Sequence, residues 1–462
     1  MTVSVAKALL TTELKTEDQP SEFWKGSDVY RHCLAANEKG LQHDPLYIYG
    51  YEFLGMAYSV YLHSVIEKIE QFGINHVMFV AREGYLFQKI YDILKPSIAT
   101  ASTAAQVTTQ YAYLSRVSTF LASAPQLTTR EVELGLDKPN QQGLWSILKT
   151  FNLPIEEFSG LAEAHGLTMQ APIANYWTDP TLTSFLSDMR VQSLVRRHHR
   201  EAHEKLSGYL GQCQFWGENR KVALVDIGWH GTIQDNLVRA FNQRPDFPLI
   251  YGLYFGRRQL KTFLKYSGSF SHGLIFDDRQ RRINAESINS CVELFEKGAG
   301  APHASTIGYT YSDSGRVQPT FKPDWQRSRQ GELAADAAVA VMQQGALDFA
   351  QQYGAQFQAK SFTAGSMKPF LEALTTRYIS FPTYQEALLV STQLGQQADD
   401  MGEDSLKRVT IAPDEFWQRV KTKDFKAAVR CFRSAHWNAG SARLLKIPGL
   451  HLLYLLKRFL SF

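Results

Sequence analysis

The chain has 462 residues, 44% of them hydrophobic and 12% aromatic, which supports a substantial core in one large domain or in two to three domains. Its formal net charge of +4 is too small to indicate nucleic acid as a partner. The four cysteines stand far apart, with no CxxC pair and no Cys/His cluster. This spacing argues against a zinc site and a disulfide framework, and predicts reduced, buried thiols in a cytoplasmic protein.

The positive charge is concentrated at the C-terminus. Residues 421–462 hold nine Lys/Arg and one acid, so this segment is +8 and the remainder about −4. A basic tail predicts an anionic surface as its partner. The N-terminus lacks the basic start and apolar run of a signal peptide. The most apolar internal segment, 53–66, is shorter than the roughly 20 residues that a membrane span needs, so we expect a buried helix there.

In chain order, the first part of the sequence alternates between helical and strand patterns. The expected elements are a short helix near 23–36 within an N-terminal arm (1–45), a buried helix over 51–70, a strand over 76–80, a helix over 85–94 that stops before Pro96, and a strand-like segment over 108–116. This alternation is typical of an α/β sheet.

From residue 121 to residue 215 the spacing of apolar residues is helical, which predicts an insertion or cap. The sheet pattern then resumes. The elements expected there are a strand over 221–228, a helix over 232–241, a strand over 249–256, a strand or edge segment over 272–278 and a helix near 286–297.

The resulting fold prediction is an α/β protein with a mostly parallel sheet. Residues 46–120 and 216–330 form its two parts, and residues 331–462 form a helical C-terminal region that ends in an amphipathic tail, 442–462. In an open α/β sheet, ligands bind beyond the carboxyl ends of the strands. Two charged strand-to-helix loops fall at such ends.

The first loop follows the strand over 76–80. Arg82 in "FVAREGY" is a candidate for binding a phosphate or pyrophosphate, and Gly84 would let a ligand approach the backbone closely. Gly-containing turns between strands and helices are common, so a single loop of this kind is weak evidence of a site. Two charged loops together favour one.

The second loop, "DIGWHGT", has Asp226 at the strand end, followed by Gly228, Gly231 and Thr232 where a helix begins. Glycines allow backbone N–H groups to converge, and a helix N-terminus favours an anion, so the loop suits a monoester phosphate. Asp226 could hold sugar hydroxyls or a metal. His230 could add positive charge, or have no role in the site.

Four runs of the sequence together resemble a domain encoded in bacterial surface-polysaccharide gene clusters, which is often joined to a phosphatase domain of the haloacid-dehalogenase type. The runs are "YGYEFLGMAYSVYLHSVIEKIEQFGINHVMFVAREGYLFQKIYDIL", "YAYLSRVS", "ALVDIGWHGTIQ" and "ELFEKGAGAPHASTIGY". The resemblance covers roughly residues 45–310. It implies a sheet of the phosphoribosyltransferase (Rossmann-like) type.

The resemblance also implies an activity. The enzyme would transfer ribose 5-phosphate from phosphoribosyl pyrophosphate to a hydroxyl of a glycan, expected to be lipid-linked, and release pyrophosphate. A phosphatase would then leave ribofuranose in the polymer. A haloacid-dehalogenase phosphatase needs a second acid two residues after its nucleophilic Asp, but Asp226 has Gly228 at that place. A separate phosphatase is therefore an expected partner.

The match to the phosphoribosyl pyrophosphate signature is incomplete. The usual signature has two adjacent acids, whereas Ile227 follows Asp226 and the loop is shorter. Glu83 could supply the missing carboxylate. Magnesium is an expected cofactor, with Asp226 as its candidate ligand. Arg116 in "YLSRVS" joins Arg82 as a candidate for the pyrophosphate, and its alternative is a surface or structural arginine.

A hydroxyl acceptor benefits from a general base. The sequence offers Glu83, Glu293 and His303 without ordering them, and the last two lie in "CVELFEKGAGAPHAST". Trp229 could stack on a sugar or serve as a packing aromatic. The basic segment 190–205 is either a solvated helix face or a contact for a lipid diphosphate.

The tail 442–462 combines Leu and Phe with Lys and Arg, and Pro448 and His451 interrupt its apolar run. It is expected to lie on a membrane surface, with docking on the core as the alternative. This would make the protein peripheral at the inner face of the cytoplasmic membrane. Two other functions stay open. One is a glycosyltransferase that uses a nucleotide sugar, for which "FDD" at 276–278 is the closest metal motif. The other is a non-catalytic scaffold of a polysaccharide assembly complex.

Overall fold

The computed structural model describes residues 20–37, 44–101, 106–135, 143–173, 175–258, 269–277, 291–394, 396–399, 405–447 and 449–450. A parallel five-stranded sheet with the order β2-β1-β3-β4-β5 lies at its centre. The strands are β1 (His76–Val80), β2 (Thr108–Ala112), β3 (Lys221–Trp229), β4 (Leu249–Arg257) and β5 (Ser269–Asp277). The predicted α/β class and parallel sheet are confirmed.

The strand order changes direction between β1 and β3. The chain moves from β1 outward to β2 on one side, and from β3 through β4 to β5 on the other. Phe79 of β1 lies opposite Val225 of β3, so the loops that follow these two strands leave the sheet at the same edge. Such a switch point is where open α/β sheets bind ligands, because the two loops diverge and leave space between them.

Alternation of side chains along the strands divides the core into two layers. In both β1 and β3, side chains at odd residue numbers face one side of the sheet and those at even numbers face the other. Val77 and Phe79 join Ala223 in one buried cluster, whereas Met78 and Val222 belong to another. Both faces of the sheet are therefore covered, as the apolar strands require.

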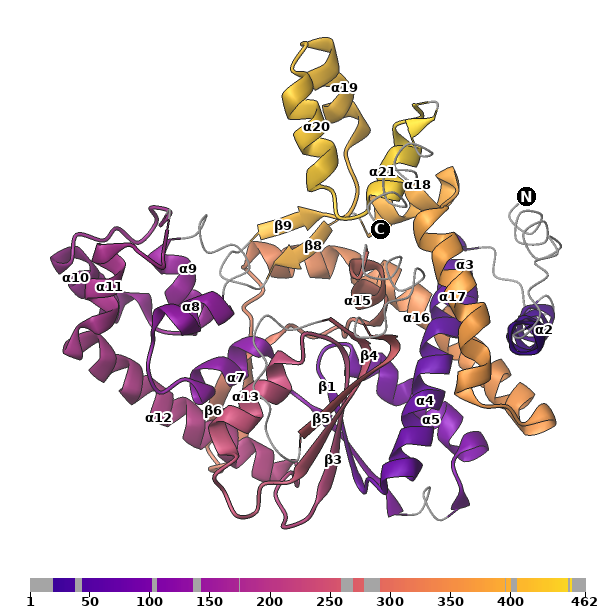
Figure 1. The fold of residues 1–462 in the computed structure, drawn as a ribbon, viewed down its shortest axis with the longest axis horizontal. Coiled ribbons are helices and arrows are strands. Elements are labelled where there is room, and N and C mark those ends of the chain that lie inside the picture. Colours follow the sequence, from indigo (N-terminus) through magenta and orange to yellow (C-terminus); the bar gives the residue numbers. More distant parts are fainter. Residues whose placement is uncertain are drawn as a thin grey trace.

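Helices cover the two faces (Figure 1). The helices on the first face are the π-helical turn η1 (Gly50–Gly55), α4 (Met56–Phe72), α5 (Gly84–Ile98) and α16 (Arg327–Lys360), and those on the second are α7 (Arg116–Ser123), α12 (Met189–Gln212) and α13 (Thr232–Phe241). The predicted helix over 51–70 corresponds to η1 and α4, and the predicted helix over 232–241 corresponds to α13.

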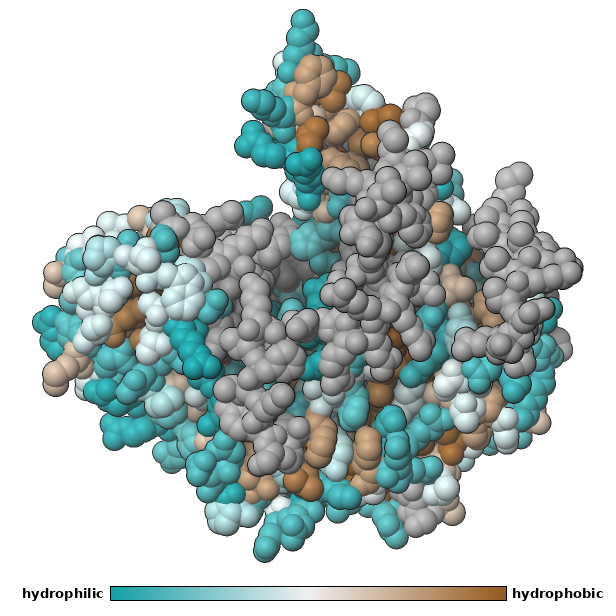
Figure 2. All heavy atoms as spheres, viewed as in Figure 1, coloured by the Kyte–Doolittle hydropathy of each residue, from teal (hydrophilic) through white to brown (hydrophobic). Residues whose placement is uncertain are grey.

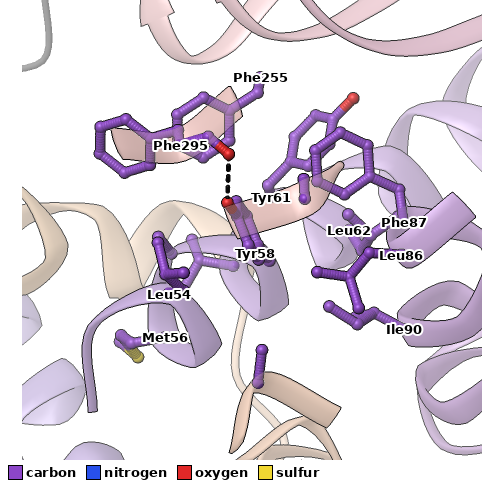
Figure 3. Close-up of a cluster of buried hydrophobic side chains, with 14 of the residues drawn as sticks. Leu54, Met56, Tyr58, Tyr61, Leu62, Leu86, Phe87, Ile90, Phe255 and Phe295 are labelled. Carbon is purple, nitrogen blue, oxygen red and sulfur yellow. Dashed lines mark hydrogen bonds between the residues drawn. The ribbon is translucent and has the colours of Figure 1, made fainter. Parts of the chain in front are cut away.

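Two tyrosines of α4 fix the sheet edge to a neighbouring helix. The Tyr61 hydroxyl donates to the carbonyl oxygens of Leu253, at 2.7 Å, and Asp226, at 2.9 Å. The Tyr58 hydroxyl donates to the Phe295 carbonyl at 2.7 Å, within the apolar cluster of Figure 3. Phe295 belongs to α15 (Glu293–Ala299). Buried hydroxyls with satisfied hydrogen bonds thus set the position of α15 relative to β3.

The segment 121–215 is helical, as predicted. It contains α8 (Thr129–Gly135), α9 (Leu144–Thr150), α10 (Ile155–Ala164), α11 (Pro180–Ser187) and all of α12. A separate buried cluster holds this region together, with Phe120, Leu148, Phe158 and Phe185 among its members. On α12, part of the basic segment 190–205 is solvated: Arg197 is exposed and pairs with Glu157 of α10.

The remaining elements lie near the chain ends and after the sheet. They are α2 (Pro20–Asn37), α3 (Pro45–Tyr49), a hairpin of β6 (Thr306–Tyr311) and β7 (Val317–Phe321), α17 (Ala364–Ser380), α18 (Tyr384–Gln393), a hairpin of β8 (Gln396–Asp399) and β9 (Ser405–Arg408), α19 (Pro413–Lys421), α20 (Phe425–Ser434) and α21 (Asn438–Leu444). The two hairpins were not anticipated from the sequence.

Several predicted boundaries were wrong. Helix α5 continues through Pro96 to Ile98, because a proline in the last turn removes only one hydrogen bond. Strand β2 ends at Ala112 rather than 116, because the side chain of Ser115 accepts from the Ser118 N–H and caps α7. Residues 286–290 of the helix predicted near 286–297 lie outside the described residues, and in the described part α15 begins only at Glu293.

The N-terminal helix and the cysteines belong to the core. In α2, Val29, Tyr30 and Cys33 are buried in the same cluster as α4 and α16, so this helix packs on the body although the sequence suggested an arm. Cys33, Cys213 and Cys291 are buried and Cys431 is half-buried, all as free thiols.

The C-terminal tail divides into a docked part and a part outside the described residues. Ala442, Leu444 and Leu445 are buried, and Lys446 lies over the ring of Tyr384, 4.4 Å from its centroid. The start of the predicted surface tail is thus part of the folded body, whereas residue 448 and residues 451–462 lie outside the described residues. Within the described ranges, no helix has the length and apolar character that crossing a membrane requires.

Candidate functional site

The loop after β1 holds Arg82 by an ion pair. Its guanidinium lies 2.5 Å from a carboxylate oxygen of Glu332, at the start of α16. The same carboxylate lies 3.4 Å from the Lys322 ammonium and 3.1 Å from the Arg329 guanidinium. Three cationic groups thus gather around one acid, which fixes Arg82 at the carboxyl edge of the sheet.

Lys297 of α15 adds another cation to this side of the site. Burial lowers the pKa of Lys297 to about 8, the charge of Glu332 opposes this change, and the charge of Arg82 adds to it. An anion bound between Lys297 and Arg82 would raise the pKa of Lys297 again and so favour its charged ammonium form. The sequence analysis did not single out Lys297, although it lies within the quoted "ELFEKG" run.

Packing at the end of β1 requires a glycine at position 84. A Cβ at this position would lie 2.6 Å from the backbone carbon of Phe79. The glycine therefore allows α5 to begin directly against the end of β1, and this packing explains its presence without a ligand.

The last two residues of β3, Gly228 and Trp229, and the loop that follows contain several residues with positive φ. Gly228, Trp229 and Gly231 have φ values of 92°, 61° and 63°. A Cβ on Gly228 would also lie 2.4 Å from the Cβ of Tyr254, so no other residue fits. Successive left-handed residues turn N–H groups toward one side of a loop, as in anion-binding nests.

Helix α13 starts directly after this loop, with Thr232 as its first residue and Gly231 as its N-cap. Because the N-cap is a glycine, it has no side chain to accept a hydrogen bond from the first N–H groups. The first N–H groups of a helix have no partner within it, and the helix dipole makes this end positive. The predicted arrangement of Gly228, Gly231 and Thr232 around a helix start is therefore present. The His230 side chain beside it is exposed.

Three carboxylates meet where the two loops converge. Burial raises the pKa of Asp226 well above its ordinary range, and the negative charges of Glu83 and Glu296 raise it further. The pKa of Glu296 rises to about 7 through burial and through the charges of Glu83 and Glu293. Like charges brought together in a poorly solvated place disfavour ionisation. Glu83 and Asp226 are thus neighbours, as the sequence suggested.

Glu296 is the acid that sequence reasoning missed. It stands one turn after Glu293 in α15, on the helix face that meets the sheet edge. The spacing of the two acids in "ELFEK" was an available signal. Arg116, at the start of α7, lowers the pKa of Glu296 through its charge, which places this predicted pyrophosphate ligand on the same side as the acids.

Glu293 is held by the C-terminal region. Its carboxylate pairs with His436, which lies between α20 and α21. Burial acts to raise the pKa of Glu293, but the hydrogen bond with His436 and the charges of His436 and Arg258 outweigh it, so that the pKa is lowered. Glu293 therefore stays ionised at neutral pH, which makes it a weaker base than Glu296.

The ring of Trp229 is not available to stack on a sugar. It is buried, it packs edge-on to Phe255, and a Cβ on Gly256 would lie 2.3 Å from the ring. The packing alternative is what the structure shows. The indole N–H lowers the pKa of Glu296, although it meets hydrogen-bond geometry with none of the described residues.

His303 is engaged through both of its ring nitrogens. Nδ1 donates to the Ala304 carbonyl at 2.8 Å, so in the neutral ring Nε2 accepts from the Tyr111 hydroxyl at 2.7 Å. Burial lowers the pKa of His303, which favours this neutral form. The histidine thus orients Tyr111 beside the Arg82 loop, and its candidate role as a base would require that hydrogen bond to break.

The described residues contain no group of three or more His, Cys, Asp or Glu arranged to hold a metal ion. Asp226 and Glu83 nevertheless suit magnesium, which proteins commonly bind through one or two carboxylates together with substrate phosphates. In the "FDD" segment, Asp277 is buried, accepts from the Gly273 N–H at 3.2 Å and lies 4.0 Å from Arg257, and Asp278 lies outside the described residues. Asp277 of this motif is therefore the buried end of β5, within the strand or edge segment expected over 272–278.

A scan of the chain against protein-family models finds no match, and a search of curated proteins finds no similar sequence.

Proposed function

We propose that the chain is a glycosyltransferase of the phosphoribosyl pyrophosphate-dependent kind, with a sheet of the phosphoribosyltransferase type. It would move ribofuranose 5-phosphate to a hydroxyl of a surface-polysaccharide acceptor. One observation carries this proposal: at the β1/β3 switch point, the acids Glu83, Asp226 and Glu296 gather between an uncapped helix start and a group of cations.

The acid cluster supports chemistry that develops positive charge. Departure of pyrophosphate from C1 of the ribose leaves positive charge on the sugar ring. Carboxylates that repel one another in the free protein are stabilised when such a charge appears between them. An enzyme accelerates a reaction by interactions that strengthen in the transition state, and preorganised charges contribute most. Asp226, near the carboxyl end of β3, is our candidate for facing the ribose.

The cations and the helix start fit the two ends of the donor. Within 228–232, the backbone N–H groups of Gly231 and Thr232 would hold the 5-phosphate, because they lie at the positive end of α13. The Gly228 N–H is used by Asp226, and the His230 N–H donates to the Gly228 carbonyl at 3.0 Å. Arg82, Lys297 and Arg116 would hold the pyrophosphate. Magnesium, carried in with the pyrophosphate and held by Asp226 and Glu83, would neutralise part of its charge.

In the proposed step, the bond between C1 and the pyrophosphate oxygen breaks and its electron pair leaves with pyrophosphate. The acceptor oxygen forms the new bond to C1, and its proton passes to a carboxylate. Glu296 suits this role best, because a pKa of about 7 lets it accept a proton near neutral pH. The product keeps its 5-phosphate, so a separate phosphatase would complete the pathway to ribofuranose.

The first test is ligand-dependent thermal stability. A donor present at 100 times its dissociation constant should add about 2.7 kcal/mol to the free energy of unfolding. We expect phosphoribosyl pyrophosphate to raise the melting temperature, and a panel of nucleotide sugars to leave it unchanged. A rise with a nucleotide sugar alone would replace this proposal by the nucleotide-sugar glycosyltransferase. No rise with any donor would favour the scaffold.

A matched pair of variants locates the binding site. Asp226→Asn removes a charge that the fold disfavours, so the variant should fold and should lose the shift with phosphoribosyl pyrophosphate. Asp246→Asn removes an acid that pairs with Arg244 before β4, at the opposite edge of the sheet, and should keep the shift. Equal shifts in both variants would exclude Asp226 from the donor site. Pyrophosphate release with a membrane extract as acceptor then tests transfer.

A further inference from the structure

The helices α19 and α20 form a hairpin that projects from the body, at the top of Figure 1. No residue of α19 is buried, and in α20 only Ala427 and Ala428 are. The hairpin therefore contributes little to the core, so its composition is explained by contacts between its surface and a partner outside the protein.

Large apolar side chains are exposed on this hairpin. Phe425 is 60% exposed, Val429 48% and Trp417 37%. Phe425 and Val429 stand four residues apart, on one side of α20. Apolar residues gather on the face of the hairpin that Figure 2 shows, with hydrophilic residues at its edge. An exposed aromatic group on an element that packs on little else marks an interaction surface.

Basic side chains lie beside the apolar ones. Lys426, Arg430 and Arg433 are exposed and follow one another at helical spacing, one residue on from Phe425 and Val429. Of the three acids on or beside the hairpin, Asp414 is exposed, and the other two are engaged within the protein. Glu415 pairs with arginines on either side of it, and Asp424 accepts from the Ala427 N–H at 3.0 Å and caps α20. The charge left for an external partner is positive.

We propose that the α19–α20 hairpin docks the protein on a bilayer that contains anionic lipids. Aromatic and aliphatic side chains bordered by Lys and Arg are the composition of helices that lie in the membrane interface. The apolar groups enter the boundary between headgroups and acyl chains, and the basic groups meet the lipid phosphates. This surface differs from the tail 442–462 suggested by the sequence, whose first residues are buried.

The hairpin is joined to the candidate site by a short connection. His436, two residues after the end of α20, pairs with Glu293 of α15. A protein docked through the hairpin therefore has the carboxyl edge of its sheet near the membrane, where a lipid-linked acceptor would be found. The docking itself does not depend on which donor the site binds.

The experiment is sedimentation of the full-length protein with vesicles, without any donor. Phosphatidylcholine vesicles are compared with vesicles that also contain phosphatidylglycerol. Wild type should bind the anionic vesicles more tightly, and salt should weaken the binding. The variant Lys426→Ala/Arg430→Ala/Arg433→Ala should bind on the order of 100-fold more weakly, because each basic group near an anionic surface contributes about fivefold.

A second variant, Trp417→Ser/Phe425→Ser/Val429→Ser, tests the apolar part and should also lose binding. The matched controls change exposed residues elsewhere: Lys25→Ala/Arg31→Ala/Arg316→Ala for charge, and Met189→Ser/Trp325→Ser for apolar surface. These controls should bind as wild type does. All substituted side chains are exposed, so circular dichroism should show unchanged folding.

Three results would overturn the proposal. Wild type could fail to bind anionic vesicles, the hairpin variants could bind them as tightly as wild type, or the controls could lose binding equally. Loss of a co-purifying protein in the hairpin variants, with no vesicle binding by wild type, would assign the surface to a protein partner instead. A failed donor-binding experiment leaves this measurement unaffected, so the two proposals can be judged separately.

Discussion

Replacing Glu296 by glutamine should change the pH dependence of stability in a defined direction. The glutamine has nearly the same shape as the glutamate but cannot ionise. The folded protein raises the pKa of Glu296 from 4.5 to about 7, because burial and neighbouring acids disfavour its charge. The variant removes this unfavourable charge without creating a cavity.

The sign of the effect follows from proton binding. Below pH 4.5 the carboxyl group is protonated in both states and has no effect. Between pH 4.5 and 7 the unfolded chain has released the proton while the folded protein keeps it, so the free energy of unfolding falls as pH rises. One pKa unit corresponds to about 1.4 kcal/mol, which gives a full loss of about 3 kcal/mol above pH 7. Partial solvent access reduces this to about 1–3 kcal/mol.

The assay is denaturant unfolding of the ligand-free protein between pH 4 and pH 8. The difference in the free energy of unfolding between Glu296→Gln and wild type should shift in favour of the variant by about 1–3 kcal/mol from pH 4 to pH 8. Glu201→Gln, which changes an exposed acid of α12, serves as the control and should follow the wild-type profile. Parallel profiles for wild type and Glu296→Gln would refute the description of the acid cluster.

The same variant separates binding from chemistry. If Glu296 accepts the acceptor's proton, Glu296→Gln should lower kcat by about 10²–10⁴ while the thermal shift with phosphoribosyl pyrophosphate persists. Its residual rate should no longer rise with pH through about 7. An unchanged kcat would leave Glu296 in the electrostatic environment of the site, but not as the base.

Two further predictions concern packing. Gly228→Ala should lower the free energy of unfolding by about 2–5 kcal/mol in a urea titration, because of backbone strain and overpacking. Its control is Gly315→Ala, which is also at positive φ but has no atom within 4 Å of the added Cβ, and which should lower the free energy of unfolding by only about 1 kcal/mol. Equal losses in the two variants would show that the clash at Gly228 is relieved. Deleting residues 442–462 should lower the free energy of unfolding by at least the stabilisation that burial of Leu444 provides, which is about 2–5 kcal/mol, as measured by thermal unfolding. A soluble deletion variant that is as stable as wild type would contradict the docked position of this segment.

The local patterns of the sequence identified the main elements of the sheet. The apolar run "HVMFV" matched β1 at both ends, and the helix over Thr232–Phe241 was placed correctly. These elements have strong periodicity and clear boundaries, so local residues decide them. The β6–β7 hairpin was missed although its turn contains Gly315 at positive φ, because its strands are short and only partly buried.

Local patterns gave the residue types of the site but not their partners. The loops with Arg82 and Asp226 could be found because parallel strands bring their carboxyl ends to one edge. Glu332 follows Arg82 by 250 residues, and His436 follows Glu293 by 143. Pairings over such separations arise from how α16 and the C-terminal region pack, which no local pattern records.

By itself, the sequence determined the α/β class, the two charged loops and the helical character of segment 121–215, since these depend on short-range periodicity and on residues at strand ends. Only the tertiary structure showed that Glu296 joins Glu83 and Asp226, that Trp229 is buried, and that the exposed basic surface lies on α19 and α20. Burial and the distances between charges set the pKa of an acid and the exposure of an aromatic ring. Both quantities depend on residues far apart in the chain, and they exist only once the chain has folded.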